Sequence, residues 1–304
     1  MNRVGAVCAA ACVLMAAIGL AAGADGTYGE LSTLATYETG DYGTGIDSAS
    51  QTLKLRYVTG DNFQFRIDVP FVRAETSVGF VRGLGGVSPD RGRFQQGPGG
   101  GGSGGSGGSG SGGPALPVGL AEESVEGSET AWTSGLGDIE LAIGKRLYGG
   151  GVDLWRFDAS LMVKAPTADD ADYLGTGEWD ARAGLGAEYR FWSATGFGGI
   201  GYTSYGDPEE YELEDVVDAY VGVESDPLFG GRAMLSGWLE GRQEIVDGAG
   251  ERTVLGIGLR TTGRPSWRAM LRTGLSTAAE DVAFTFGLSW GVQTGSTAVK
   301  GVQR

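Results

Sequence analysis

Short segments in which apolar and polar residues alternate recur along almost the whole chain, and no other feature restricts the possible folds as much. In residues 62–71, for example, Phe63, Phe65 and Ile67 fall on one side of an extended chain, whereas Gln64 and Arg66 fall on the other. A β-strand places successive side chains on opposite faces, so this stretch is predicted to be a strand with one apolar and one polar face. The sequence contains twelve such segments, some less regular than others: 30–39, 51–57, 62–71, 138–147, 155–164, 179–191, 196–205, 217–224, 232–246, 255–260, 267–275 and 282–292. They predict an all-β fold.

The connections between these segments differ in length from one end of the strands to the other. If the first strand rises from one side of a membrane, the connections on that side are short, as at 59–61, 148–151 and 192–195. The opposite side has far longer ones, at 73–133 and 165–178. A soluble β-sandwich or solenoid would show the same alternation, but short turns at one end and long loops at the other are typical of outer-membrane barrels. We therefore predict a transmembrane, antiparallel, up-and-down β-barrel of about 12 strands.

Tryptophan positions test this prediction independently, because Trp prefers the membrane–water interface. All of the 7 Trp residues except Trp238 fall at predicted strand ends. Those at the periplasmic ends are Trp155, Trp192, Trp267 and Trp290, and those at the outer ends are Trp132 and Trp179. A soluble sandwich would have little reason to sort aromatic residues in this way.

A closed barrel also satisfies the backbone in lipid, where every N–H and C=O group needs a partner. Pro70 is the visible exception, since it cannot donate to a sheet ladder. We expect it near the outer rim of its strand, where a lost hydrogen bond costs least.

The first 24 residues have the form of an export signal. Arg3 gives a positive start, residues 4–20 are apolar or small, and residues 22–24 have the small-x-small form of a cleavage site before Asp25. We predict a cleaved signal peptide over residues 1–24 and a barrel over 25–304 that the barrel-assembly machinery inserts into the bacterial outer membrane. A retained anchor is the alternative, because about 17 apolar residues approach the length of a spanning helix.

Composition excludes several classes of function. The 304 residues include no His, which removes the Ser-His-Asp and Cys-His catalytic sets and the commonest transition-metal ligand. The 2 cysteines, Cys8 and Cys12, both lie in the predicted signal peptide. The formal net charge of -15 disfavours a nucleic-acid partner, since phosphate binding requires a basic face. We therefore expect no enzyme activity, no cofactor, no metal site and no nucleic-acid binding.

The polar faces of the predicted strands carry charges of both signs. Twelve are basic: Lys54, Arg56, Arg66, Arg146, Arg156, Lys164, Arg182, Arg190, Arg242, Arg260, Arg268 and Arg272. Ten are acidic: Asp68, Asp138, Glu140, Asp158, Asp180, Glu188, Asp218, Glu224, Glu240 and Glu244. The predicted lumen is thus nearly neutral, and the excess of acid belongs to the loops.

Two interpretations of this charged face stay open. The charges could form ion pairs that fill and stiffen a barrel of intermediate size, or they could line a narrow aqueous passage that favours anionic solutes. For the second interpretation the candidate selectivity residues are Lys54, Arg56, Arg66, Asp68, Glu140, Arg156, Asp158, Arg182, Glu188, Arg268 and Arg272.

Three other motifs carry less information. Acidic runs at 169–172 and 209–215 in predicted outer loops could hold a divalent cation bridging to lipopolysaccharide, but such runs are more often solvated loops. The Gly/Ser tract at 99–113 is expected to be a disordered tether. The segment 196–201 fits G-x-G-x-x-G but leads into another strand instead of a helix, so we expect a glycine-rich barrel strand.

Three stretches resemble the outer-membrane family of the MetA-pathway of phenol degradation. They are residues 53–60 running into the Val69-Pro70-Phe71 step, the Gly-rich entry 134–138 ending in Asp138, and the segment from Ala165-Pro-Thr through 174–177 to Asp180. The resemblance extends over most of the chain outside the Gly/Ser insert. It implies a barrel that passes small, often aromatic, solutes and provides no catalytic residues.

These observations lead to two hypotheses. The first is an outer-membrane channel for the passive passage of small organic solutes, including aromatic or anionic ones. The second is a non-conducting structural or adhesive barrel that displays its surface loops. Outer-membrane lipids and lipopolysaccharide are the expected partners of either, with small organic solutes for the first.

Overall fold

The computed structural model describes residues 28–40, 46–59, 62–75, 80–81, 116–117, 132–149, 153–168, 177–206, 213–245, 250–263, 265–276, 279 and 281–293. The predicted signal peptide, the Gly/Ser tract at 99–113 and most of both acidic runs lie outside these ranges. Within them, no helix has the length and apolar character needed to cross a membrane.

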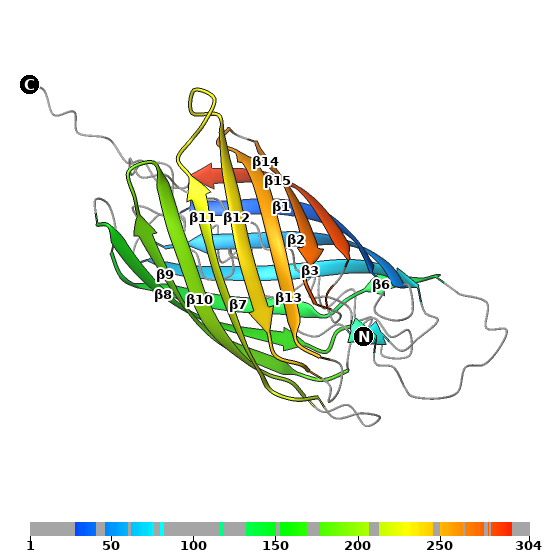
Figure 1. Ribbon diagram of the computed structural model, residues 1–304. Coiled ribbons are helices and arrows are strands. Elements are labelled where there is room, and N and C mark those ends of the chain that lie inside the picture. The colour runs from blue at the N-terminus through cyan, green and yellow to red at the C-terminus, as the bar shows by residue number, and fades with distance from the viewer. Residues whose placement is uncertain are drawn as a thin grey trace, which may run out of the picture.

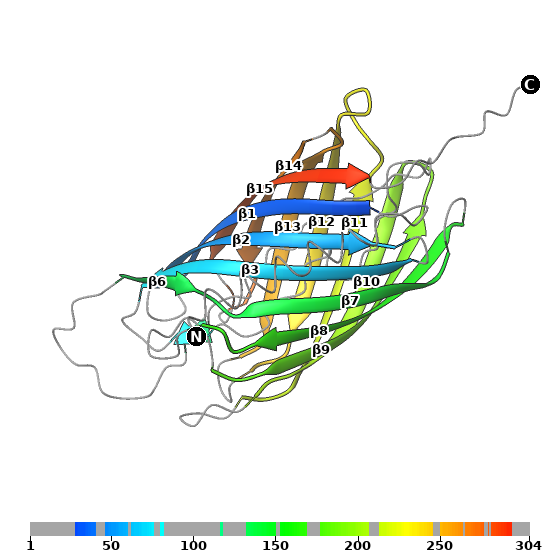
Figure 2. The ribbon, with the colours of Figure 1, turned by 180° about the vertical axis from the view of Figure 1, so that it is seen from behind.

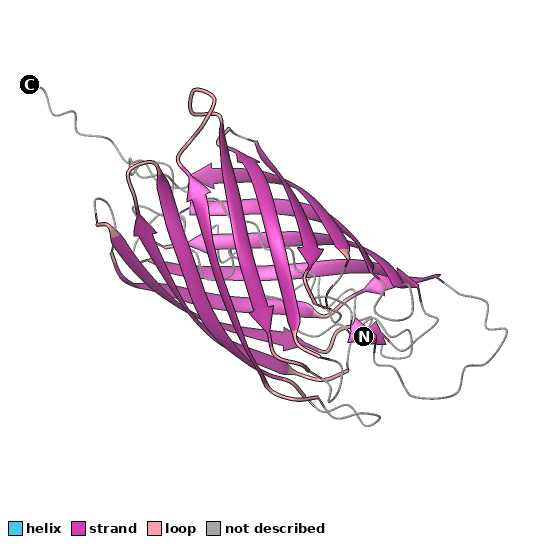
Figure 3. Cartoon of the chain, in the orientation of Figure 1, coloured by secondary structure: helices cyan, strands magenta, loops and turns pink. Residues whose placement is uncertain are grey.

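Nearly all of the described chain is β-strand (Figure 3). The strands are β1 (Tyr28–Gly40), β2 (Ile46–Val58), β3 (Phe63–Glu75), β4 (Phe80–Val81), β5 (Leu116–Pro117), β6 (Trp132–Leu136), β7 (Ile139–Tyr148), β8 (Trp155–Ala165), β9 (Asp180–Arg190), β10 (Ala194–Ser204), β11 (Val216–Ser225), β12 (Ala233–Arg242), β13 (Arg252–Thr261), β14 (Ser266–Gly274) and β15 (Val282–Gln293). Each of the twelve predicted strands is present. The glycine-rich segment 196–201 lies within β10, as predicted.

The sheet closes on itself because β1 pairs antiparallel with both β2 and β15. Every other neighbour in the ring is also antiparallel and follows the order of the sequence, as the two opposite views in Figures 1 and 2 show. Strands β6 and β7 both pair with β3 and are two parts of one strand, so the barrel has twelve strands. The predicted up-and-down barrel is confirmed. In the long connection after β3, the segments β4 and β5 pair with each other in a small separate sheet.

A one-residue bulge separates β6 from β7. Phe71 pairs with Leu136 and Asp68 pairs with Glu140, so two residues of β3 face three residues of the other strand. An extra residue reverses the alternation of faces. As a result Glu140 faces inward together with Asp68, whereas Leu136 shares the outer face with Phe71.

The prediction that Pro70 lies near the outer rim of its strand was wrong. Strand β3 continues to Glu75, so Pro70 lies well inside the strand rather than at its rim. The missing N–H falls opposite the bulge, where the ladder is already interrupted, and the carbonyl oxygen of Pro70 still accepts a hydrogen bond from the Gly137 N–H at 2.9 Å. A Cβ at Gly137 would lie 3.1 Å from the Pro70 ring, so the close approach favours glycine there.

The two faces of the wall differ in chemistry as the alternation predicts. Large apolar side chains are exposed on the outside, for example Leu161 at 59%, Leu185 at 56% and Val221 at 61%. Charged side chains such as Asp68, Asp158 and Glu240 are buried on the inside. Exposed apolar side chains on β2, β3 and β7 to β15 of a closed barrel fit a hydrocarbon environment.

Aromatic side chains gather at the end of the barrel that carries the short turns, which is the periplasmic end in barrels of this kind. Trp155 lies 4.7 Å from Tyr189 and stacks on Phe157 at 5.8 Å, measured between ring centroids. Tyr189 in turn meets Phe191 edge-on at 5.0 Å. These contacts join the ends of β8 and β9 in an interfacial belt.

Candidate functional site

The interior of the barrel is the candidate site, because the predicted selectivity residues all occupy inward positions of their strands. Most of them are less than 9% exposed, and only Arg156 and Arg272 are somewhat more exposed than this. Alternation alone placed them on this face. Their partners, in contrast, come from neighbouring strands and became apparent only in the structure.

Asp68 is the centre of a cluster on β2 and β3. Its Oδ2 lies 3.1 Å from Lys54 Nζ and 3.2 Å from Arg66 Nε, and the residue is 0% exposed. Arg56 pairs in the ladder with Arg66, so two guanidinium groups project inward from adjacent strands. Glu140 on β7 is the ladder partner of Asp68. The cluster thus has three bases for two acids.

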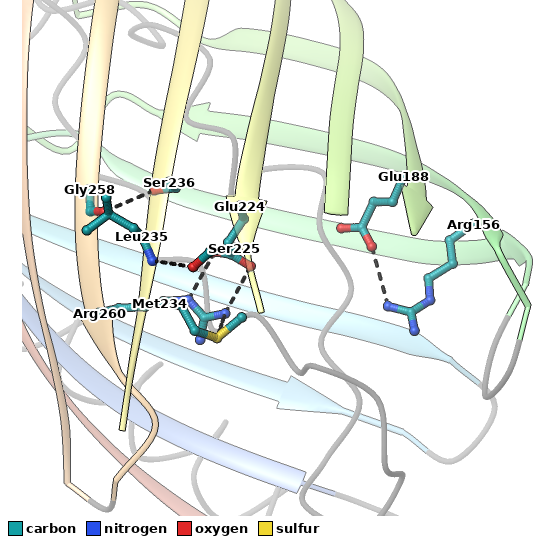
Figure 4. A network of polar contacts seen from close by, with 9 residues as sticks. All are labelled: Arg156, Glu188, Glu224, Ser225, Met234, Leu235, Ser236, Gly258 and Arg260. Atoms are coloured by element: carbon teal, nitrogen blue, oxygen red, sulfur yellow. Dashed lines mark hydrogen bonds and ion pairs between the residues drawn. The ribbon is translucent and has the colours of Figure 1, made fainter. Parts of the chain in front are cut away.

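A second cluster joins the periplasmic ends of β7, β8 and β9. Arg146 Nε lies 3.2 Å from Asp158 Oδ1, and both side chains are only 2% exposed. Arg156 Nη1 lies 3.5 Å from Glu188 Oε2 (Figure 4).

Arg182 reaches across a whole strand to its partner. Its Nε lies 3.1 Å from Asp218 Oδ1, although Arg182 is on β9 and Asp218 on β11. Gly201 on the intervening β10 makes this possible, because a Cβ there would overlap the Arg182 guanidinium group.

Arg260 and Arg268 project from the adjacent strands β13 and β14, where they are ladder partners. Arg260 Nη2 lies 3.0 Å from Glu224 Oε1 and also contacts the sulfur of Met234 at 2.8 Å (Figure 4). Arg268 Nη2 donates to Ser289 Oγ at 2.9 Å.

A further cluster lies nearer the outer end. Lys164 Nζ lies 3.1 Å from Asp138 Oδ2 and 2.8 Å from Asp180 Oδ2. The other oxygen of Asp138 accepts hydrogen bonds from the N–H groups of Thr167 and Ala168, at 3.0 and 2.9 Å. Asp138 therefore fixes the start of the connection after β8, which brings together two of the stretches that carry the family resemblance.

Arg252 was missed by sequence reasoning. It is 1% exposed, and its Nη1 lies 2.6 Å from Glu240 Oε1. The predicted strand began at residue 255, but Arg252 and Val254 continue its inward alternation and could have extended the strand.

The bases are not spread evenly along the barrel axis. Within four residues of the periplasmic ends of the strands, the inward face of the described strands carries four acids: Asp158, Glu188, Glu224 and Glu30, the ladder partner of Arg56. The same level has seven inward arginines, which we call the arginine tier: Arg56, Arg66, Arg146, Arg156, Arg190, Arg260 and Arg268. Toward the outer end, acids and bases are nearly balanced.

Sequence reasoning also missed a cluster of aromatic side chains in the lumen. Phe197, Tyr220 and Trp238 on β10, β11 and β12 pack together and are less than 9% exposed. Each ring lies over an inward glycine of a neighbouring strand: a Cβ at Gly222, Gly199 or Gly256 would overlap Phe197, Tyr220 or Trp238, respectively. The sequence signal was the mid-strand position of Trp238. Among the described residues, the buried Trp238 N–H has no hydrogen-bond acceptor.

The outer end of β10 and β11 is held by a different set of contacts. Met162, Tyr205, Leu213, Val216 and Ile245 form a buried apolar cluster. Next to it, Asp215 accepts hydrogen bonds from the Tyr202 hydroxyl and from the Tyr205 N–H. The hydrogen bond from Tyr202 lowers the pKa of Asp215, which therefore stays ionised.

No protein-family model matches the chain, and no curated protein matches it significantly. Among solved structures, the COG4313 outer membrane channel from Pseudomonas putida F1 is similar over 88% of this chain and 96% of its own, with 14% identity and a TM-score of 0.61. The NanC porin (7% identity, 86% and 98% coverage, TM-score 0.48) and the translocator domain of autotransporter NalP from Neisseria meningitidis (14%, 95% and 99%, 0.45) are less similar in structure. The first similarity shows that the chain has the fold of a bacterial outer-membrane barrel.

Proposed function

We propose that the protein is an outer-membrane channel for the passive passage of small organic solutes that carry a negative charge. The arginine tier is the observation that carries this proposal, because seven inward arginines outnumber the four inward acids at the same level. Rings of Arg or Lys favour anions in pores. The channel similarity in fold agrees with this role.

Within this proposal, the solute class is a small organic acid with an aromatic ring. Phe197, Tyr220 and Trp238 make this part of the lumen wall aromatic, and an aromatic solute that enters the lumen is expected to pack against it. The tier offers guanidinium groups to a carboxylate. Membership of the MetA-pathway of phenol degradation family, proposed from the motifs around Pro70, Asp138 and Asp180, agrees with such solutes.

A non-conducting barrel that displays its loops is the second candidate. It is favoured by the burial of the inward charges in ion pairs and by the apolar cluster around Val216 at the outer end. For either candidate, outer-membrane phospholipids, lipopolysaccharide and the barrel-assembly machinery are proposed partners.

Single-channel recording in a planar bilayer under a salt gradient tests the proposal. We expect a small steady conductance whose reversal potential shows anion preference. Replacing Arg56, Arg66 and Arg268 by Gln is expected to move the reversal potential toward the cation side, because three positive charges leave the tier. The change Arg73→Gln is the matched control, since Arg73 is exposed on the outer face of β3.

The two candidates give different results in this experiment. A folded protein that never conducts would contradict the channel and support the display barrel. Conductance whose selectivity is the same in the triple variant and the control would contradict the role of the tier.

A further inference from the structure

A hollow of about 650 Å³ lies in the outer surface of the wall, over β7 to β11. Its sides are apolar side chains such as Leu161, Leu185 and Ile200, each more than half exposed. The exterior of a barrel is normally convex, so a concave region of this size needs a local cause.

Small residues are that cause. Ala159 and Ala183 form the floor of the hollow, at lipid-facing positions whose neighbours carry Leu161 and Leu185. On the inner side of the same wall, Gly184 and Gly201 carry no Cβ, and the Arg182 guanidinium group lies over Gly201.

An apolar hollow at membrane depth must be filled by apolar groups. Water would find no polar partner there, and an empty hollow would lose the dispersion contacts of its lining. A methylene group takes up roughly the volume of a water molecule, about 30 Å³. The hollow therefore has room for about twenty methylenes, which is enough for one acyl chain.

The charged residues at the two ends of the hollow determine the orientation of the acyl chain. Lys145, an exposed residue at the periplasmic end of the hollow, places its Nζ 4.4 Å from the centroid of the Phe63 ring. At the opposite end, the hydroxyl group of Tyr202 donates to the Asp215 carboxylate. An anionic headgroup is attracted to the first end and repelled by the second.

We propose that this hollow binds one acyl chain of a phospholipid of the periplasmic leaflet, with its phosphate held by Lys145. Lipopolysaccharide approaches from the other leaflet and would place its phosphates beside Asp215. The specificity comes from shape and from the headgroup contact, because lipid tails are as apolar as the lining and no hydrophobic driving force separates them.

Native mass spectrometry of the folded protein, freed of lipid and titrated with dioleoyl phosphatidylglycerol, tests the site. We expect the first lipid to bind at least tenfold more tightly than the following ones. The double variant Ala159→Phe/Ala183→Phe fills the hollow and is expected to lose this first step. Ala269→Phe on β14 is the matched control, because Ala269 also faces outward but lies outside the hollow.

The headgroup contact is tested separately with Lys145→Gln, which keeps the shape of the hollow and remains informative if the bulkier variant does not fold. We expect about a fivefold loss of affinity for the first lipid, the usual effect of one basic residue at an anionic lipid surface. The control Arg73→Gln is expected to bind like the wild type, and the heat-dependent shift in electrophoretic mobility verifies folding of each variant.

Three results would overturn the proposal. The first is equal affinity of wild type and filled variant for every lipid bound. The second is a preference for lipid A that depends on the hollow but not on Lys145. The third is a dimer of the chain that dissociates when the hollow is filled, since a second copy would then be the occupant.

Discussion

At the scale of single residues, the interior depends on paired charges and on glycines that make room for large side chains. A buried charge without a partner is costly, and Asp68 avoids this cost by contacting both Lys54 and Arg66. Trp238 avoids a steric clash, because Gly256 has no Cβ and so leaves space for the indole against the wall.

Gly256→Ala is expected to destabilise the barrel, although replacing glycine within a strand by alanine usually stabilises it. A Cβ at Gly256 would overlap the Trp238 ring, and overpacking of this kind typically costs about 1–3 kcal/mol. Gly241→Ala is the matched control, since nothing lies within 4 Å of its Cβ position. Urea unfolding in lipid vesicles measures both variants. Equal midpoints would show that the indole moves at no cost.

Residue positions were more predictable than residue partners. Alternation gave the inward direction of Arg182 and of Asp218, because that depends only on parity along each strand. Their contact could not be predicted, since it passes over Gly201 on a third strand and depends on the pairing register of all three. Arg252 was missed for a simpler reason. The predicted strand begins three residues later than β13 does, so it leaves out the first inward charge of that strand.

At the scale of elements, a bulge places a side chain on a face of the wall that regular alternation would not give it. The bulge between β6 and β7 turns Asp138 inward, where it fixes the connection after β8 through Thr167 and Ala168. The sequence predicted the strand from 138 onward, but the bulge was not predictable, because β6 and β7 each keep a normal alternation and only their shared partner β3 shows the shift.

The connection between β10 and β11 is expected to loosen in acid. The folded-state pKa of Asp215 is lowered, so its contribution is present above the unfolded value of about 3.9 and is lost as the pH falls through the folded value. Protonation weakens the acceptor for Tyr202 and for the Tyr205 N–H. The protection factor for hydrogen exchange near Tyr205, measured relative to the intrinsic exchange rate at each pH, should therefore fall below about pH 4. Asp215→Asn should already show a low protection factor at pH 7, and a wild-type protection factor that does not change with pH would contradict this role.

At the scale of the whole molecule, closure and charge distribution decide what the barrel can do. Twelve strands give a lumen between the filled barrels of about 8 strands and the open porins of about 16, so side chains set its width. The strand number followed from the sequence. The concentration of arginine at one end did not, because it appears only when all strands are aligned in register.

The pairing of β1 with β15 has one more consequence, since Tyr28 is the ladder partner of Gln293. The two ends of the strand-forming chain lie side by side at the end with the short turns, and no strand of the ring is structurally first. A circular permutant that joins residue 293 to residue 28 by a short linker, and starts instead at Trp132 and ends at Glu75, is expected to fold into the same barrel. The electrophoretic mobility of the folded form and the conductance of the permutant would measure this. A permutant that never folds would show that the order of strand addition, and not only the final pairing, is encoded in this chain.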